Sequence, residues 1–297
     1  MTTTIQKFTK RFLVAALAAS AVLASTEPAD AQEILLTGPL AGAPAVRKLR
    51  LYREGRFEIA PTVTFSLLDE YQRTIFLGAR LQYHFTDWLG VGAWGAYGGL
   101  INITTALTDH IQEVNSSPAR SDGGYENPER RLTAVNLGPN FEDQLGTIDW
   151  IIAPQITAVP FRGKLALFQG IYVDTDLYAF AGPAIMGLTE RADCGAEGQQ
   201  SCQPGPNVAF EMTTRTAIAP TFGIGLSFYV NKWSAIGFEW RFLPFSMNTG
   251  GFDTAGGGQD EEYPDNRITD ADRGFAFRQL LSLSYNIFLP TQHRISE

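Results

Sequence analysis

The chain has 297 residues and carries 31 acidic against 23 basic residues, for a formal net charge of −8. This acidic balance argues against nucleic acid as a partner, because a phosphate backbone attracts Lys and Arg. Beyond an N-terminal apolar stretch, no apolar run is long enough to cross a membrane as a helix, which excludes a helical inner-membrane protein.

The N-terminus has the pattern of a secretory signal peptide. Basic residues precede an apolar run at residues 12–24, and small residues come before a predicted cleavage site between Ala31 and Gln32. We therefore expect residues 1–31 to be removed on export. The run is too short and wrongly flanked for a membrane anchor.

The next segment, residues 32–54, shows no strand periodicity. Its second half is basic and includes Arg47, Lys48, Arg50 and Arg53. Two interpretations are open for this periplasmic lead-in. It is either a flexible tail, or a segment that docks on a partner or plugs the mouth of a barrel.

From Arg56 onward, apolar and polar residues alternate strictly. The apolar positions run from Phe57 to Leu67, and after a polar break at 68–72 the alternation resumes up to Phe85. Successive side chains of a strand point to opposite faces, so the pattern predicts a hairpin with one apolar and one polar face. Each strand has about a dozen residues, which is long for a globular sheet and close to the length that crosses a bilayer at a tilt.

A third strand is predicted over residues 89–97. It contains a G-x-G-x-x-G match from Gly90 to Gly95. A dinucleotide fingerprint opens a helix, whereas these glycines lie inside a strand pattern, so we reject a nucleotide site. We interpret the glycines as inward positions that leave room for a bulky neighbour across a narrow lumen.

A long excursion over residues 98–148 comes next, and helical spacing from Ile103 to Val114 predicts a short amphipathic helix there. A turn is expected at 160–164. Five further strands are predicted, at 150–159, 173–185, 216–230, 236–242 and 275–287. Short and long connections alternate between the strands, as is typical of outer-membrane barrels, whose even strand count places both termini in the periplasm.

These elements predict an all-β fold, a closed eight-stranded antiparallel transmembrane β-barrel of up-and-down topology. The barrel would cover residues 55–289, followed by a periplasmic tail at 290–297. Aromatic residues near the strand ends are expected to form interfacial girdles. The girdle candidates are Tyr83, Phe85, Trp88, Trp150, Tyr229 and Trp233. Prolines inside strands, at 61, 154, 183 and 220, require bulges or positions near the interfaces.

A soluble lipocalin-type barrel would show the same alternation with its apolar face inside. The polar face favours a membrane barrel, because the strand at 216–230 offers Ala, Thr, Gly and Ser, which suit a narrow interior rather than a surface in water. The few charged residues on this face include both signs, and buried charges need partners. We therefore predict a lumen charge network. Its members are Arg56, Glu58, Arg80, Glu239, Arg241 and Arg278.

Several motifs resemble a family of outer-membrane β-barrel domains that is common in gliding and predatory delta-group Gram-negative bacteria. They include Phe57-Glu58-Ile59-Ala60-Pro61, the run at 160–165 and Asp176-Leu177-Tyr178. The resemblance covers roughly residues 55–289. It implies a barrel domain without a particular activity and, in some members, a place in an envelope-spanning assembly. More distantly, the architecture is similar to OmpA- and OmpX-type barrels.

Two cysteines, Cys194 and Cys202, lie in a polar segment with seven residues between them. In an exported protein this spacing favours a disulfide that staples a loop. A metal site is the weaker interpretation, because no His or third Cys lies near. Calcium binding by the acidic loop at 246–272 is an open alternative, but the loop lacks the regular ligand spacing of a calcium loop, so no metal site is predicted there.

An enzyme acting on lipids would need a His near a Ser or a carboxylate at the outer rim. His110 is the sole candidate, beside Asp109 and close to Ser116 and Ser117. Such residues coincide readily by chance in one polar loop. We therefore expect no catalytic residue and no cofactor.

We thus expect a non-enzymatic protein of the outer membrane, surrounded by lipid, with a structural or partner-binding role. Its partners would be other envelope proteins, reached through the external loops or the basic lead-in. Two alternatives stay open, a narrow pore for small solutes and a lipid-modifying enzyme. Side chains fill the lumen of an eight-stranded barrel, which argues against a resting aqueous channel.

Overall fold

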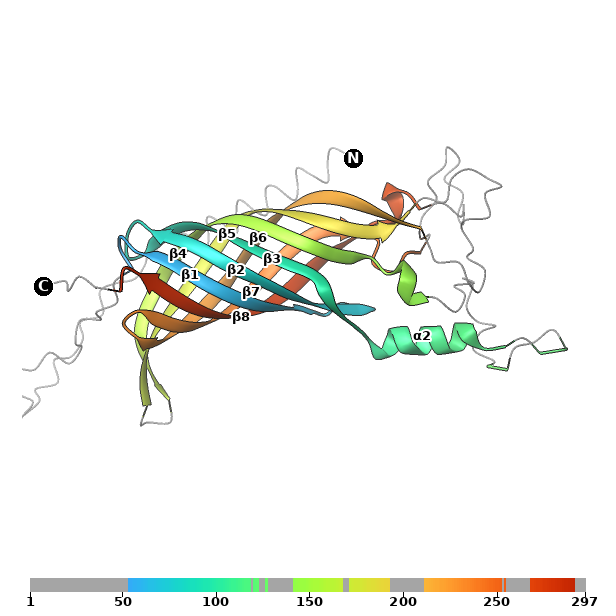
Figure 1. Cartoon of the computed structure of the whole chain (residues 1–297), viewed down its shortest axis with the longest axis horizontal. Helices are drawn as coiled ribbons and strands as arrows, with labels where there is room; N and C mark the ends of the chain where they lie inside the picture. Colours follow the sequence, from blue (N-terminus) through green and yellow to red (C-terminus); the bar gives the residue numbers. More distant parts are fainter. Residues whose placement is uncertain are drawn as a thin grey trace, which may run out of the picture. The chain divides into compact units, whose positions relative to one another are not determined.

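The computed structural model describes residues 53–118, 120–122, 126–127, 141–167, 171–192, 211–252, 254 and 268–291. Within these residues, eight antiparallel strands form a closed barrel in sequence order, with β1 also pairing with β8 (Figure 1). The predicted fold class is confirmed. The signal cleavage site at Ala31 and Gln32, nearly all of the lead-in, and both Cys194 and Cys202 lie outside the described residues.

The strands are β1 (Phe57–Leu67), β2 (Gln72–His84), β3 (Leu89–Thr104), β4 (Thr147–Leu167), β5 (Ile171–Arg191), β6 (Met212–Asn231), β7 (Ser234–Met247) and β8 (Gly274–Leu289). The connections contain the helix α2 (Ala106–Ser116) and two short 3-10 helices, η2 (Phe141–Gln144) and η4 (Asp270–Asp272). In the part of the chain that the structure describes, no helix has both the length and the apolar character needed to span a membrane. The predicted helix is present as α2, which begins at Ala106 with Thr105 as its N-cap.

The expected turn at 160–164 is wrong. β4 instead continues to Leu167 and pairs with β5 back to Ile171, and the register shifts between Ala158 and Phe161. The shift accommodates Pro160, whose missing N–H would otherwise interrupt the ladder. A proline that signals a turn in sequence therefore lies at an irregularity inside a longer strand.

Three of the other strand prolines, for which bulges or positions near the interfaces were expected, lie in regular register without a bulge. Pro183 of β5 faces Pro220 of β6 in regular register. The ladder between β6 and β7 begins only at Phe222, so Pro220 lies beyond it on that side. Pro61 likewise pairs regularly with Ala79, while the ladder to β8 is interrupted beside it. On one side of each of these three prolines the neighbouring strand forms no pair with it, so no backbone N–H donor is required there.

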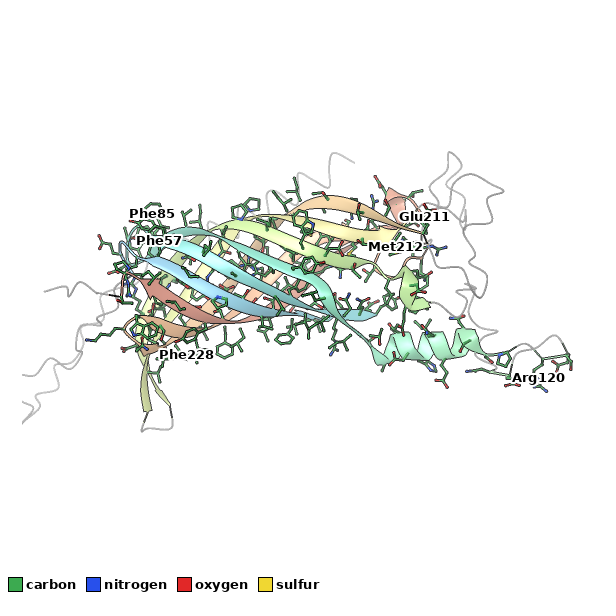
Figure 2. The ribbon with its side chains drawn as sticks, in the orientation of Figure 1. Phe57, Phe85, Arg120, Glu211, Met212 and Phe228 are labelled. Carbon is green, nitrogen blue, oxygen red and sulfur yellow. The ribbon has the colours of Figure 1, made fainter. Side chains whose placement is uncertain are left out.

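The two faces of the wall have opposite character. Outward side chains are large and apolar, for example Phe57, which is 58% exposed, and Phe222 and Phe238, which are also exposed. Inward side chains such as Arg80 and Arg241 are buried. A water-soluble barrel would have the reverse arrangement, so this wall is suited to lipid. Figure 2 shows Phe57, Phe85 and Phe228 together near the end of the barrel where β1 begins.

The lumen is filled in two different ways along its length. The half near the start of β1 and the end of β8 contains charged and aromatic side chains, which form the candidate site. The other half contains an apolar core of inward side chains. Its buried members are Phe76, Trp94, Ala96, Ile148, Ile151, Ala153, Ala184, Met186, Leu188, Ala217, Ala219, Leu243, Phe245, Met247 and Leu280.

Candidate functional site

The charged half of the lumen is built around Glu58, which β1 presents to the interior. Arg80 of β2 donates to Glu58 with Nη2 to Oε1 at 2.5 Å. His84, four residues further along β2 and on the same face, places Nε2 at 2.8 Å from the other carboxylate oxygen. All three side chains are almost completely buried. Their common inward parity on adjacent strands brings these side chains within contact.

A second carboxylate, Glu239 of β7, binds the same arginine from the other side. Arg80 forms an ion pair with Glu239 and also donates to the hydroxyl of Tyr178 on β5, which in turn donates to Glu239 at 3.0 Å. Arg80 therefore bridges two carboxylates across the lumen. An arginine suits this position because its guanidinium presents several donors in one rigid plane.

Arg241 marks the boundary between the two halves of the lumen. Its guanidinium carbon lies 4.4 Å from the ring centroid of Trp94 and 4.2 Å from that of Phe180. The same group donates to Gln155 at 2.8 Å and lies 3.6 Å from Glu239. Stacking between two aromatic faces stabilises a cation that is removed from water.

A third pair was not anticipated from the sequence. Arg53, which precedes β1, is buried in the lumen, where its Nη2 lies 2.9 Å from Asp176 of β5. Its Nε donates to the hydroxyl of Tyr229, which donates onward to Asp176. The carboxylates of Asp176 and Glu58, which lie 2.9 and 3.9 Å from its Nη atoms, compensate the charge of this buried guanidinium.

The expectation that Tyr229 belongs to an interfacial girdle is wrong. Tyr229 has the inward parity of its neighbours on β6, and its ring stacks on Phe288 with centroids 5.7 Å apart. A position near a strand end does not decide which face a side chain takes, whereas alternation along the strand does. The hydroxyl it carries into the lumen connects Arg53 to Asp176.

Two inward glycines make room for this network. A Cβ on Gly225 would lie 2.3 Å from the ring of Tyr178, and a Cβ on Gly223 would lie 2.6 Å from the ring of Phe180. Each glycine is paired directly with that aromatic residue across β5 and β6. The inward glycines of β6 therefore accommodate the aromatic side chains that contact Arg80 and Arg241.

The six predicted network residues do not all meet. The structure brings together Glu58, Arg80, Glu239 and Arg241. Arg56 instead donates to the backbone carbonyls of Lys232, Phe288 and Pro290 at the rim. Arg278 lies at the opposite end, where it pairs with Asp69 at 2.8 Å.

Alternation could have revealed some of the missed members. His84, Asp176 and Tyr178 all lie at inward positions of their strands. Their charge or polarity at these positions was sufficient to predict them as members of the network. Arg53 carried no such signal, because it precedes the alternating region. With it, three guanidinium groups face three carboxylates in this half of the lumen. The residues are Arg53, Arg80, Arg241, Glu58, Asp176 and Glu239.

The other end of the barrel has a smaller charged cluster. Glu190 of β5 is buried and accepts two hydrogen bonds from Arg215, at 2.9 and 3.0 Å. Arg273 adds a third at 3.1 Å, and the backbone N–H of Asn248 a fourth at 3.0 Å. These bonds satisfy the buried carboxylate and hold β5, β6, β7 and the start of β8 together. Such a saturated group is suited to a structural role.

The residues considered for catalysis lie on or next to α2. His110 is exposed. Asp109 accepts a hydrogen bond from Thr104 at 3.0 Å, and Ser116 donates to the carbonyl of Glu113. Ser117 accepts from the backbone N–H of Asn127 at 2.8 Å. The polar groups around His110 are therefore engaged locally.

Metal-ligating residues do not gather in the described parts of the chain, where no group of three or more His, Cys, Asp or Glu could hold an ion. The acidic loop at 246–272 lies partly outside those parts. Of its carboxylates, Asp272 accepts from the backbone N–H groups of Thr254 and Thr269, each at 2.7 Å. Asp272 thereby closes a capping box with Thr269 at η4.

No family model matches the sequence, and no curated protein matches it. Among solved structures, the chain is similar to the N-terminal β-barrel domain of Pseudomonas aeruginosa OprF, with 8% identity and a TM-score of 0.39 over 80% of this chain and 98% of that chain. OprG from the same organism is 9% identical, with a TM-score of 0.40 over 81% of this chain and 99% of that chain. Ail of Yersinia pestis is 11% identical, with a TM-score of 0.32 over 80% of this chain and 99% of that chain. At these low values, function has to be inferred from this chain's own residues, and the delta-group resemblance stays a prediction.

Proposed function

We propose that this protein is a non-conducting outer-membrane barrel with a structural or partner-binding role in the cell envelope. It would be exported through a cleaved signal peptide and surrounded by outer-membrane lipid. The observation that carries the proposal is the filling of the lumen along its whole length. Charged groups bridge the wall in one half, and apolar side chains pack in the other.

The filled lumen argues against the alternative of a narrow pore. At its middle, the side chains of Trp94, Arg80, Arg241 and Tyr178 are among the largest that are fully buried. A solute would have to displace both the ion pairs and the stacked rings. Beyond this layer lies the apolar core, which offers no polar partner to a hydrated solute.

The alternative of a lipid-modifying enzyme has less support. The candidate His110 has Asp109 beside it, but this carboxylate accepts from Thr104. A catalytic pair needs a base held within reach of its nucleophile or of a second acid. We therefore assign the external segments to contacts with other molecules rather than to chemistry.

Planar-bilayer recording on the purified protein tests the proposal. We expect no stable channel from the wild type. We expect discrete channel openings from a Trp94→Ala/Arg241→Ala variant, since this variant hollows the layer between the two halves. Folding of both proteins is checked by the mobility difference between heated and unheated samples. A stable, reproducible channel from the wild type would overturn the proposal in favour of a pore.

A further inference from the structure

β4 and β5 extend well beyond the barrel wall. Each has 21 residues, and their pairing continues from Phe161 opposite Leu177 to Leu167 opposite Ile171. Figure 1 shows this yellow-green hairpin projecting beyond the other strands, at the end where β1 begins. At about 3.3 Å per residue, residues 161–167 reach roughly 20 Å out of the wall.

In the part of the chain that the structure describes, no strand adjoins either edge of this extension, which we call the ribbon (residues 161–167 and 171–174). β3 pairs with β4 only as far as Ala158, and β6 pairs with β5 only from Thr175 onward. Within the described residues, no other strand pairs with the ribbon. Every second residue of each edge therefore presents its N–H and C=O outward, and an isolated two-stranded ribbon is only marginally stable in water.

The base of the ribbon is fixed to the rim of the barrel. Arg162 pairs with Asp87 in the turn between β2 and β3, with 3.3 Å between Nη1 and Oδ2. The other oxygen of Asp87 accepts from the backbone N–H groups of Arg53 and Glu54. The ribbon thus leaves the wall from a held position, and it presents its edges in a defined direction.

The two edges differ in their sequences. The β4 edge includes Gly163 and Lys164, with Pro160 just before it, and residues of this kind discourage the pairing of further strands. The β5 edge begins with Ile171, Tyr172 and Val173, which are β-branched or aromatic and favour strands. The β5 edge has neither Pro nor Lys, and its one charged residue, Asp174, lies at the base of the ribbon next to the first residue that pairs with β6. It is therefore the edge more open to an additional strand.

We propose that the β5 edge of the ribbon binds an extended polypeptide segment of a periplasmic protein, which adds to it as a third strand. The chemistry of the edge selects this occupant, because its alternating N–H and C=O groups match only another extended backbone. The inference rests on the proposed function for its orientation, since an outer-membrane barrel with an even number of strands would place the end where β1 begins and β8 ends in the periplasm.

Hydrogen exchange followed by mass spectrometry tests this docking site. The amides of residues 161–174 are compared between the purified protein in detergent and the same protein in native outer-membrane vesicles that retain their periplasmic partners. We expect at least tenfold slower exchange in the vesicles, confined to the ribbon. Equal exchange in the two preparations would overturn the proposal.

Two matched variants separate strand addition from other coverage of the ribbon. Val173→Lys places a charge on the β5 edge and should abolish the slowing, whereas Ala166→Lys on the β4 edge should leave it intact. Slowing that survives Val173→Lys would show that something other than an added strand covers the ribbon, and would also overturn the proposal. Conductance is independent of these measurements, so failure here is distinguishable from failure of the proposed function.

Discussion

The two halves of the lumen are enclosed by the same wall but are filled by different interactions, ion pairs in one half and apolar packing in the other. In the charged half, Arg80 bridges Glu58 and Glu239, and the buried charge of each group is compensated by the opposite charge of its partner. In the apolar half, side chains such as Met186 and Leu243 pack as they would in the core of a soluble protein. The apolar exterior of the barrel contacts lipid and does not fill the lumen. Water is therefore excluded from the lumen by the inward side chains, which form a core of their own.

The difference predicts different costs of damage. Removing one partner of a buried ion pair leaves an uncompensated charge, whereas removing methyl groups leaves a cavity. Substitutions in the two halves therefore distinguish the two kinds of filling.

Arg80→Met should give the largest effect. It leaves Glu58 and Glu239 buried without their shared cation, and we expect a loss of about 3–5 kcal/mol in the free energy of unfolding. Urea titration of the protein in detergent micelles, followed by tryptophan fluorescence, measures this loss. Arg120→Met is the control, because Arg120 and its partner Asp122 are both 59% exposed. A loss as small from Arg80→Met as from this control would contradict the charged-half interpretation.

Leu243→Ala should cost less, about 3 kcal/mol, because it opens a cavity in the apolar half. The matched control is Leu283→Ala on β8. Leu283 faces outward and is 44% exposed, whereas Leu243 is fully buried. Detergent fills the space that Leu283→Ala leaves, so the control lacks the cavity contribution. Equal losses in the same urea titration would mean that the apolar half is loosely packed.

Gly225→Ala should give the smallest of the three effects, about 1–3 kcal/mol from overpacking. Its Cβ would displace the ring of Tyr178 from the hydrogen bonds with Arg80 and Glu239. Gly163→Ala on the ribbon is the control, because no atom lies within 4 Å of the added Cβ. The melting temperature of each variant in micelles measures the effect, and an unchanged value for Gly225→Ala would show that the Tyr178 contacts add little.

Part of the charged site could be predicted from the sequence. Alternation placed Glu58, Arg80, Glu239 and Arg241 on one face, because the direction of a strand side chain depends only on its parity. Parity does not say which strands meet across the lumen. It also could not separate the apolar half from the charged half, since Met186 and Leu243 have the same inward parity as Arg80.

By itself, the sequence determined that eight long strands alternate and that one face of each strand is strongly apolar and points outward. Both are local properties that follow from a period of two residues. Only the tertiary structure decided that Arg53 enters the lumen to meet Asp176, that Pro160 bends β4 without ending it, and that the ribbon continues beyond the wall. These features depend on which segments closure of the barrel brings together, and such contacts between residues distant in sequence leave no periodic trace in the chain.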